Sequence, residues 1–350
     1  MVVAFHICEP HSTSHLDQVI NHGYLAVDFF FVLSGFVVGY AYDDRWSRMT
    51  IGNFFKRRLI RLQPMVIMGM IVGAICFYFQ ASTVAPLIKV TPVWQMLLIT
   101  LIGCTMIPVP VSMDIRGWKE MYPLNGPAWS LFFEYIVNIL YAIVIRRLSK
   151  TILAILVFLA AAALVYLTVM GKTGDVVGGW SLETGQLQIG FTRVMYPFFA
   201  GLLLCRAAKL THIRHAFLLC GILIVAVLSI PRIGGSETVW FNGIYESICI
   251  IFVFPLIVYL GASGEMQNGR ISRICKFFGD ISYPLYITHY PLIYIYIGWV
   301  IDNNLSLREA LPMGVLTFLS AIILAYLCLR LYDLPLRSWL QKKLLKNERL

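Results

Sequence analysis

Five ionisable side chains lie inside apolar stretches of this sequence, where each needs a partner or a chemical task. They are His6, Asp28, Glu134, Arg193 and His289. A charged group at mid-membrane costs about 2.5 to 3.5 kcal/mol on insertion scales. A free imidazole titrates at about pH 6.5, so it suits a general base, and a buried carboxylate can fix its tautomer. The set predicts a polar cavity between helices, with His6 as the base and Asp28 or Glu134 beside it.

The remaining members of this set are expected to line the same cavity and to face a substrate there. Arg193 and His289 either bind that substrate or only satisfy the charges of the cavity. Trp129 precedes Glu134 and suits the aromatic belt at a membrane surface, so it is grouped with them as a substrate contact. For any single residue, a structural ion pair or a satisfied core histidine is the competing interpretation. Together the residues favour a functional site.

A basic cluster, "NFFKRRLIRLQP", follows the second apolar run. Arg58 and Arg61 are three residues apart and share one face of a helix, with Lys56 and Arg57 beside them. Such a cluster can be a plain anchor on the cytoplasmic side of a membrane. Because the guanidinium fork suits phosphate, the sharper hypothesis is an anion clamp made by Arg57, Arg58 and Arg61.

Histidines also gather in the loop "HICEPHSTSHLDQVINH", where His11 and His15 are four apart and Asp17 and His22 lie nearby. A zinc site needs a firmer pattern, and neither H-E-x-x-H nor a pair of thiolates is present. We expect polar loop residues at the mouth of the cavity and no metal. The sequence also lacks a phosphate loop and a G-x-S-x-G elbow, so ATP hydrolysis and serine esterase chemistry are unsupported.

The elements that must position these residues are predicted to be membrane helices. The chain is 59% hydrophobic and 13% charged, with mean hydropathy +0.76. Its net charge of +10 comes from short basic clusters between apolar runs, which argues against nucleic acid as a partner. A crossing helix needs about 20 apolar residues. Nine runs qualify: 23–42, 62–81, 126–145, 151–170, 190–207, 216–231, 243–262, 280–301 and 310–332.

Basic residues in the loops decide the topology. The stretch 93–110 is interrupted by Pro108 and Pro110, and we expect it to be re-entrant or interfacial. With that assignment the loops on one side carry twenty Lys and Arg and those on the other carry six, so the richer side and the C-terminus are cytoplasmic. By parity, "MVVAFHIC" is the outer end of a first, apparently shortened helix. The prediction is an all-α polytopic transmembrane bundle of about ten helices.

Ordered motifs resemble a known family. The blocks "VVAFH", "GYLAVDFFFVLSGFVVG", "FFKRRLIRLQP", "PAWSLFFE" and "GDISYPLYITHYPL" occur in the order found in the family-three integral-membrane acyltransferases, which are mostly bacterial and modify glycans. The similarity runs over about residues 1–340, which we take as one membrane acyltransferase domain followed by a basic cytoplasmic tail, 341–350. The ending "YDLPLRSWL" is similar to the family's acidic-x-Pro ending, with Asp333 where Glu is commoner.

The resemblance implies an O-acyltransferase of the bacterial inner membrane. It implies acyl-coenzyme A on the cytoplasmic side as co-substrate, with acetyl as the expected acyl group and no tightly bound cofactor. The acceptor would be a hydroxyl of a cell-surface glycan or its lipid-linked precursor. It gives His6 an essential role in transfer and Arg58 and Arg61 a role as the R-x-x-R pair.

Two alternatives stay open at this point. Intramembrane charge and a basic mouth also suit a transporter or flippase for an anionic glycan or metabolite, and a nonenzymatic subunit of a glycan export complex would tolerate loss of His6. Within the enzyme hypothesis, the acyl group moves either directly to the acceptor or through an acyl-histidine.

Overall fold

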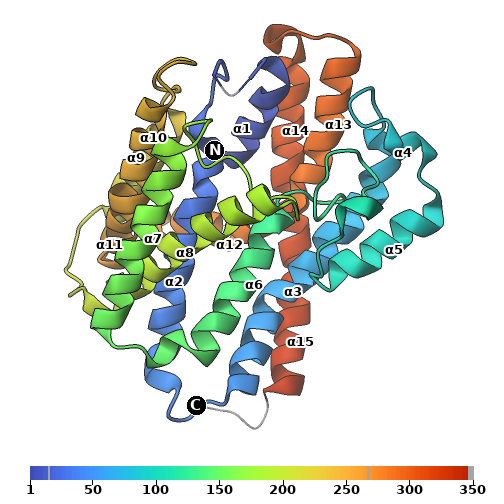
Figure 1. The fold of residues 1–350 in the computed structure, drawn as a ribbon. Helices are drawn as coiled ribbons and strands as arrows, with labels where there is room; N and C mark the ends of the chain where they lie inside the picture. The colour runs from blue at the N-terminus through green and yellow to red at the C-terminus, as the bar shows by residue number, and fades with distance from the viewer. Residues whose placement is uncertain (15, 266–268, 346–350) are drawn as a thin grey trace.

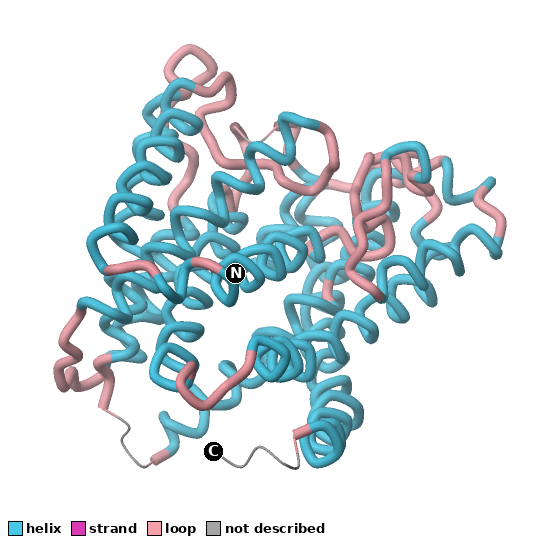
Figure 2. Tube along the Cα trace, turned by 60° about the horizontal axis from the view of Figure 1, so that its bottom comes forward, coloured by secondary structure: helices cyan, strands magenta, loops and turns pink. Residues whose placement is uncertain are grey.

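The structure is a computed structural model that describes residues 1–14, 16–265 and 269–345. Within these ranges the chain is a bundle of α-helices (Figure 1). Figure 2 shows helices and loops without strands over the same part of the chain, apart from a single bridge between Ile213 and Gly264. The all-α prediction is confirmed.

The first half of the chain forms seven of the helices. They are α1 (Val2–Cys8), α2 (Ala26–Tyr42), α3 (Ile51–Cys76), α4 (Leu87–Val90), α5 (Val93–Cys104), α6 (Ala128–Ile143) and α7 (Lys150–Met170). The second half forms α8 (Thr184–Ala207), α9 (Ala216–Ser229), α10 (Trp240–Ile248), α11 (Phe254–Ala262), α12 (Arg270–Thr288), α13 (Tyr290–Asp302), α14 (Leu307–Leu327) and α15 (Leu334–Leu344). Short π-helical segments join α10 to α11 and α14 to α15.

The helices account for every predicted apolar run. Six continuous helical stretches are long and apolar enough to cross a membrane: His22–Arg45, Ile51–Gln80, Lys150–Met170, Thr184–Ala207, Trp240–Ala262 and Leu307–Leu344. The shorter apolar helices α6 and α9 coincide with two other runs, and α13 covers the second half of the run 280–301. The chain is therefore a multi-pass membrane protein. The interrupted stretch 93–110 forms only the short helix α5, which packs against α3 and projects from the bundle in Figure 1.

The run 280–301 is not one helix, which corrects the prediction. It is divided between α12 and α13 at His289, because Pro291 lies in the first turn of α13 and has no amide proton to give. The carbonyl that this proton would have bonded belongs to Ile287. That oxygen instead accepts a hydrogen bond from Asn125 Nδ2 at 2.8 Å. The carbonyl left free at the break is thus hydrogen-bonded. The ring of His289 lies next to that of His6 in α1.

Helices α2 and α8 are packed backbone to backbone. A Cβ on Gly35 would lie 2.0 Å from the carbonyl oxygen of Phe198, and a Cβ on Gly201 would lie 2.0 Å from that of Val32. Glycine is required at both positions because any larger residue would force the helices apart, as in other close membrane packings. This contact brings the outer ends of α2 and α8 together, where two site residues face each other.

Replacing Gly35 by Ala is expected to destabilise the protein by about 1–3 kcal/mol through overpacking. The midpoint of thermal unfolding in detergent should fall accordingly. Gly185→Ala in the same helix pair is the matched control, since a Cβ added there would have no atom within 4 Å and alanine is the better helix former. A Gly35→Ala protein that unfolds at the temperature of the control would contradict the packing argument.

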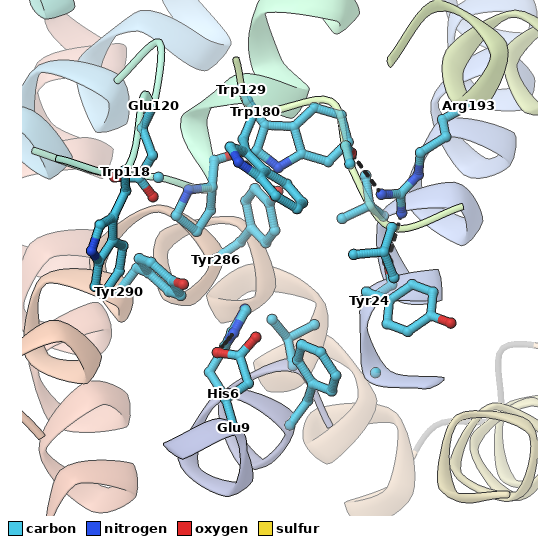
Figure 3. Close-up of a pocket in the computed structure, with 18 residues that line it drawn as sticks. His6, Glu9, Tyr24, Trp118, Glu120, Trp129, Trp180, Arg193, Tyr286 and Tyr290 are labelled. Carbon is cyan, nitrogen blue, oxygen red and sulfur yellow. Dashed lines mark hydrogen bonds and ion pairs between the residues drawn. The ribbon is translucent and has the colours of Figure 1, made fainter. Parts of the chain in front are cut away.

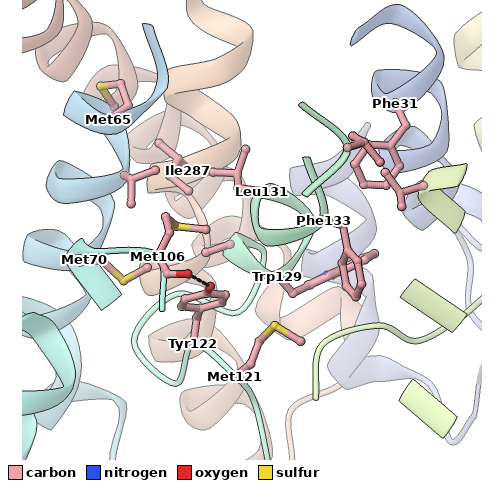
Figure 4. Packing of buried hydrophobic residues seen from close by; sticks show 14 of the residues in the cluster. Phe31, Met65, Met70, Met106, Met121, Tyr122, Trp129, Leu131, Phe133 and Ile287 are labelled. Atoms are coloured by element: carbon pink, nitrogen blue, oxygen red, sulfur yellow. Dashed lines mark hydrogen bonds between the residues drawn. The ribbon is translucent and has the colours of Figure 1, made fainter. Parts of the chain in front are cut away.

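A large apolar core underlies the site. Figure 4 shows Phe31 of α2, Met65 of α3 and Phe133 of α6 in one cluster of buried side chains that includes the loop before α6. In that loop Tyr122 is buried and donates its hydroxyl to the carbonyl of Met106 at 2.7 Å. The loop 105–127 also buries Met106, Met121 and Leu124 in this core, so it is fixed to the bundle and can serve as a rigid wall.

The helix ends gather as the loop charges predict. In Figure 1 the turn between α2 and α3 and the end of α15 lie at the lower end of the bundle, and the turn between α13 and α14 lies at the upper end. The predicted boundary between the domain and its tail falls inside α15, which continues through Leu344. Residues 346–350 of that tail lie outside the described residues.

Candidate functional site

A cavity of about 420 Å³ opens between α1, α2, α8, α12, α13 and the loops that precede α6 and α8 (Figure 3). A volume in this range suits a small organic ligand. Its walls carry aromatic and ionisable side chains together. Those labelled in Figure 3 are His6, Glu9, Tyr24, Trp118, Glu120, Trp129, Trp180, Arg193, Tyr286 and Tyr290.

His6 stands in this cavity with a carboxylate partner. Its Nδ1 lies 2.7 Å from Oε2 of Glu9, and the two side chains are 16% and 25% exposed. A carboxylate only accepts hydrogen bonds, so Nδ1 carries a proton, and in the neutral ring Nε2 keeps its lone pair. The ring of Tyr290 meets the imidazole edge-on at a centroid distance of 4.6 Å. His6 is thus held in the tautomer that a general base requires.

Asp28 is engaged elsewhere, so its predicted contact with His6 is wrong. Arg193 donates to it from Nη2 at 2.7 Å and from Nε at 3.2 Å, and both side chains are buried. The prediction that an arginine or histidine would offset the burial of Asp28 is confirmed. Arg193 also donates to the carbonyls of Tyr24 and Gly178, at 2.9 and 3.1 Å. Four of its five N–H groups are then used within the protein.

Glu134 lies with the arginine cluster and not with His6. Its Oε1 accepts a hydrogen bond of 2.6 Å from Nη2 of Arg58. Ser34 Oγ and Asn138 Nδ2 donate to the same oxygen at 2.5 and 2.9 Å. The expectation that Glu134 lies beside His6 is corrected, because its carboxylate is bonded to Arg58 and it does not line the cavity of His6.

Two further cavities lie next in a series that shares lining residues. One of about 200 Å³ is lined by Arg58, Arg61 and Glu134, and it shares Val27 and Tyr286 with the cavity of His6. The next, of about 400 Å³, shares Arg61 with the second cavity. It is lined by Tyr42, Arg45, Arg57, Arg61, Arg337 and Gln341, among others. Shared lining residues thus place a pocket rich in arginine at the lower end of the bundle two cavities away from His6.

The predicted substrate contacts divide. Trp129 lines the first cavity, and its ring centroid lies 5.0 Å from the guanidinium carbon of Arg193. His289 is fully buried and does not line it. Its Nδ1 lies 3.0 and 2.9 Å from the carbonyls of Leu285 and Tyr286, and its ring is 5.6 Å from that of His6. His289 thus supports the position of His6 from behind, and its role in substrate binding stays a prediction.

Glu120 lines the cavity and was missed by sequence reasoning. It lies in the loop before α6, and burial raises the pKa of its carboxyl to about 7, against the opposing charge of Arg116 at 3.6 Å. Glu9 was also missed, although its spacing of three from His6 was a usable signal.

The histidines of the loop after α1 do not converge. His11 Nε2 bonds the hydroxyl of Tyr296 at 2.9 Å, Asp17 accepts from Thr13 and Ser14, and His22 is buried against Asn242. His15 lies outside the described residues. Among the residues that the structure describes, no group of three His, Cys, Asp or Glu is arranged to hold a metal ion.

Comparison with known proteins shows that a family model matches most of the chain. A family described as "Acyltransferase domain" matches residues 1–330. "O-acetyltransferase OatA" of Staphylococcus aureus is 22% identical over 351 residues, 93% of this chain and 54% of its own length. "Protein 2 in picA locus" of Rhizobium radiobacter is 32% identical over 148 residues, 40% of this chain and 76% of its own. The chain thus spans about half of the O-acetyltransferase. No solved structure matches significantly.

Proposed function

Because the chain belongs to the acyltransferase family whose match covers residues 1–330, we propose that it transfers an acyl group between two substrates across its connected cavities. The donor is cytoplasmic acyl-coenzyme A, with acetyl as the expected acyl group. The acceptor is a hydroxyl of a cell-surface glycan or its lipid-linked precursor. The membrane is the bacterial inner membrane, with the C-terminus in the cytoplasm.

The observation that carries this proposal is a series of three cavities in which each shares lining residues with the next. Arg61 lines both the lowest cavity and the middle one. Val27 and Tyr286 line both the middle cavity and the cavity of His6. A donor with a compact anionic end and a long thin arm suits such a path. Its charged end would stay in the lowest, arginine-lined cavity while its thioester reaches His6.

The lowest cavity suits the phosphates of coenzyme A. Arg45, Arg57, Arg61 and Arg337 line it, and no carboxylate is among its lining residues. Guanidinium forks bind phosphate through pairs of charge-assisted hydrogen bonds. Arg337 is itself held by Asp333, which is buried and accepts from its Nη1 at 2.8 Å. This contact gives the acidic-x-Pro ending of the chain a physical task.

The transfer follows from the orientation of His6. Nε2 takes the proton of the acceptor hydroxyl as its oxygen attacks the thioester carbonyl, and Glu9 stabilises the imidazolium through Nδ1–H. The carbon–sulfur bond then breaks. The thiolate leaves with the electron pair and takes the proton from Nε2, so coenzyme A departs as a free thiol and the imidazole is regenerated.

Replacing both Arg61 and Arg337 by Gln is expected to raise the KM for acetyl-coenzyme A about tenfold or more, since hydrogen bonds to charged groups contribute about 1.5–3 kcal/mol each. The KM for the acceptor should be unchanged. Release of free thiol in membranes at matched expression measures the effect. Arg308→Gln, an exposed arginine in α14 at the opposite end of the bundle, is the control. A donor KM equal to that of the control would remove the arginine pocket from the proposal.

The function itself is tested by two paired readouts. Mass spectrometry of surface glycans should show an acyl increment only in cells that express the active chain, and membranes should release one thiol for each group transferred. A transporter would move its substrate without releasing coenzyme A. Glycans that lose nothing when the gene is deleted would end the proposal.

A further inference from the structure

The cavity of His6 has a second group of features besides His6 and Glu9, namely aromatic rings and a further carboxylate. Aromatic rings form much of its wall, with Trp118 and Tyr290 on one side of Figure 3 and Trp129 and Trp180 on another. Trp118 is fixed, because its indole N–H donates to the carbonyl of Val84 at 2.8 Å. Rigid aromatic faces pack against the apolar faces of sugar rings at low entropic cost.

The ionisable side chains of this wall offer a ligand two carboxylates and no cation that lacks a counter-ion. The ionisable lining residues are His6, Glu9, Glu120 and Arg193. Arg193 is neutralised by Asp28, and its remaining donors are mostly given to two backbone carbonyls. Two carboxylates remain: Glu9 beside His6, and Glu120 across the cavity, whose nearest cation, Arg116 at 3.6 Å, does not itself line the cavity. A ligand with its own negative charge would meet repulsion here and find no unpaired cation among the lining residues.

Glu120 is built into this wall. The hydroxyl of Tyr294 lies 2.8 and 2.7 Å from its two oxygens, and the guanidinium of Arg116 lies over the Tyr294 ring at 3.5 Å. Arg116 in turn donates to the carbonyl of Pro123 and to Gln80. A Cβ on Gly126 would lie 2.7 Å from the Glu120 carboxylate, so glycine is what admits the carboxylate here. The group is 8% exposed and leaves lone pairs for a ligand.

We infer that this wall is the acceptor subsite, that it takes a sugar residue without negative charge, uncharged or amino-bearing, and that Glu120 determines this specificity by accepting a hydrogen bond from the sugar. The inference rests on the proposed function and deepens it. Glu120 contacts the acceptor and takes no part in the proton transfer, which belongs to His6. Sugars with a carboxylate or phosphate at the reacting residue are excluded by Glu9 and Glu120 together.

The first experiment locates the acyl group in cells. Glycans from cells with and without the gene are fragmented in a mass spectrometer, and the sugar that bears the acyl increment is identified. We expect a neutral or amino sugar. An acyl group on a uronic acid, a sialic acid or a phosphorylated sugar would overturn the inference while leaving the transferase function in place. No acyl increment together with no thiol release would overturn both.

The second experiment separates specificity from packing. With purified protein and acetyl-coenzyme A, Glu120→Gln should raise the KM for the acceptor identified in cells at least fivefold and leave the KM for the donor within twofold. Tyr294→Phe keeps the carboxyl group and removes its fixed partner, so we expect a smaller change. Glu237→Gln, an exposed residue of the loop after α9, is the control. Equal acceptor KM values in Glu120→Gln and Tyr294→Phe, or a Glu120→Gln value equal to the control, would overturn the role of Glu120.

Discussion

Replacing His6 by Ala is expected to lower the rate of acyl transfer by about 10²- to 10⁴-fold, the range that a general acid–base group contributes. The reason is that Nε2 is the base in the cavity with a fixed orientation, given by the 2.7 Å contact of Nδ1 with Glu9. The effect should fall on kcat, because the arginine path that binds the donor does not depend on the imidazole. Thiol release and acylated product, measured together in membranes, give the rate.

Two further variants calibrate this result. Glu9→Gln keeps the shape of the side chain but removes the charge that stabilises the imidazolium, so we expect a smaller loss of about tenfold. His212→Ala changes an exposed histidine that does not line the cavity, and this variant should transfer the acyl group at the normal rate. If His6→Ala behaves like His212→Ala, the mechanism is wrong.

An experiment on the wild-type protein can distinguish direct transfer from transfer through an acyl-histidine. Acetyl-coenzyme A is added without acceptor, the reaction is quenched, and peptides containing residue 6 are weighed. An acyl increment on the wild-type peptide that disappears when acceptor is added favours the covalent route. Its absence while transfer proceeds favours direct attack.

The sequence predicted which side chains needed partners but not which partners they have. A carboxylate in an apolar run requires a cation, and Asp28 has one in Arg193. The two residues are 165 positions apart, and hydrophobic periodicity does not show which helices touch. Their meeting depends on the close approach of α2 and α8 at Gly35 and Gly201, which is a property of packing.

Errors in depth have a similar origin. Counting residues from a helix end places the backbone, whereas the charge of an arginine lies at the end of a long side chain. The sequence therefore predicts Arg58 in an anion clamp and Glu134 beside His6, although their side chains are in contact with each other. Glu120 lies in a loop without periodicity, so its position depends on contacts with Tyr294 and Arg116 that only the folded chain creates.

Removing the carboxylate of Asp28 is expected to cost about 3–5 kcal/mol of folding free energy, because Asp28→Ala leaves the guanidinium of Arg193 buried without its counter-ion. Both side chains are at most 2% exposed, so water cannot take the place of the carboxylate without opening the packing of α2 against α8. Titration with a denaturing detergent measures the loss. It should exceed the effect of Gly35→Ala, since an unpaired buried charge is costlier than a local clash.

A double variant and an exposed ion pair make this prediction decisive. Asp28→Leu combined with Arg193→Met removes both charges at similar volume and should recover a large part of the stability, because apolar pairs often replace buried ion pairs at little cost. Glu183→Gln breaks the pair with Lys119, whose side chains are 49% and 56% exposed, and should change stability by about 0–1 kcal/mol. An Asp28→Ala protein as stable as Glu183→Gln would mean that water reaches Arg193. The arginine would then be free to bind an anion, and the exclusion of negatively charged acceptors would fail with it.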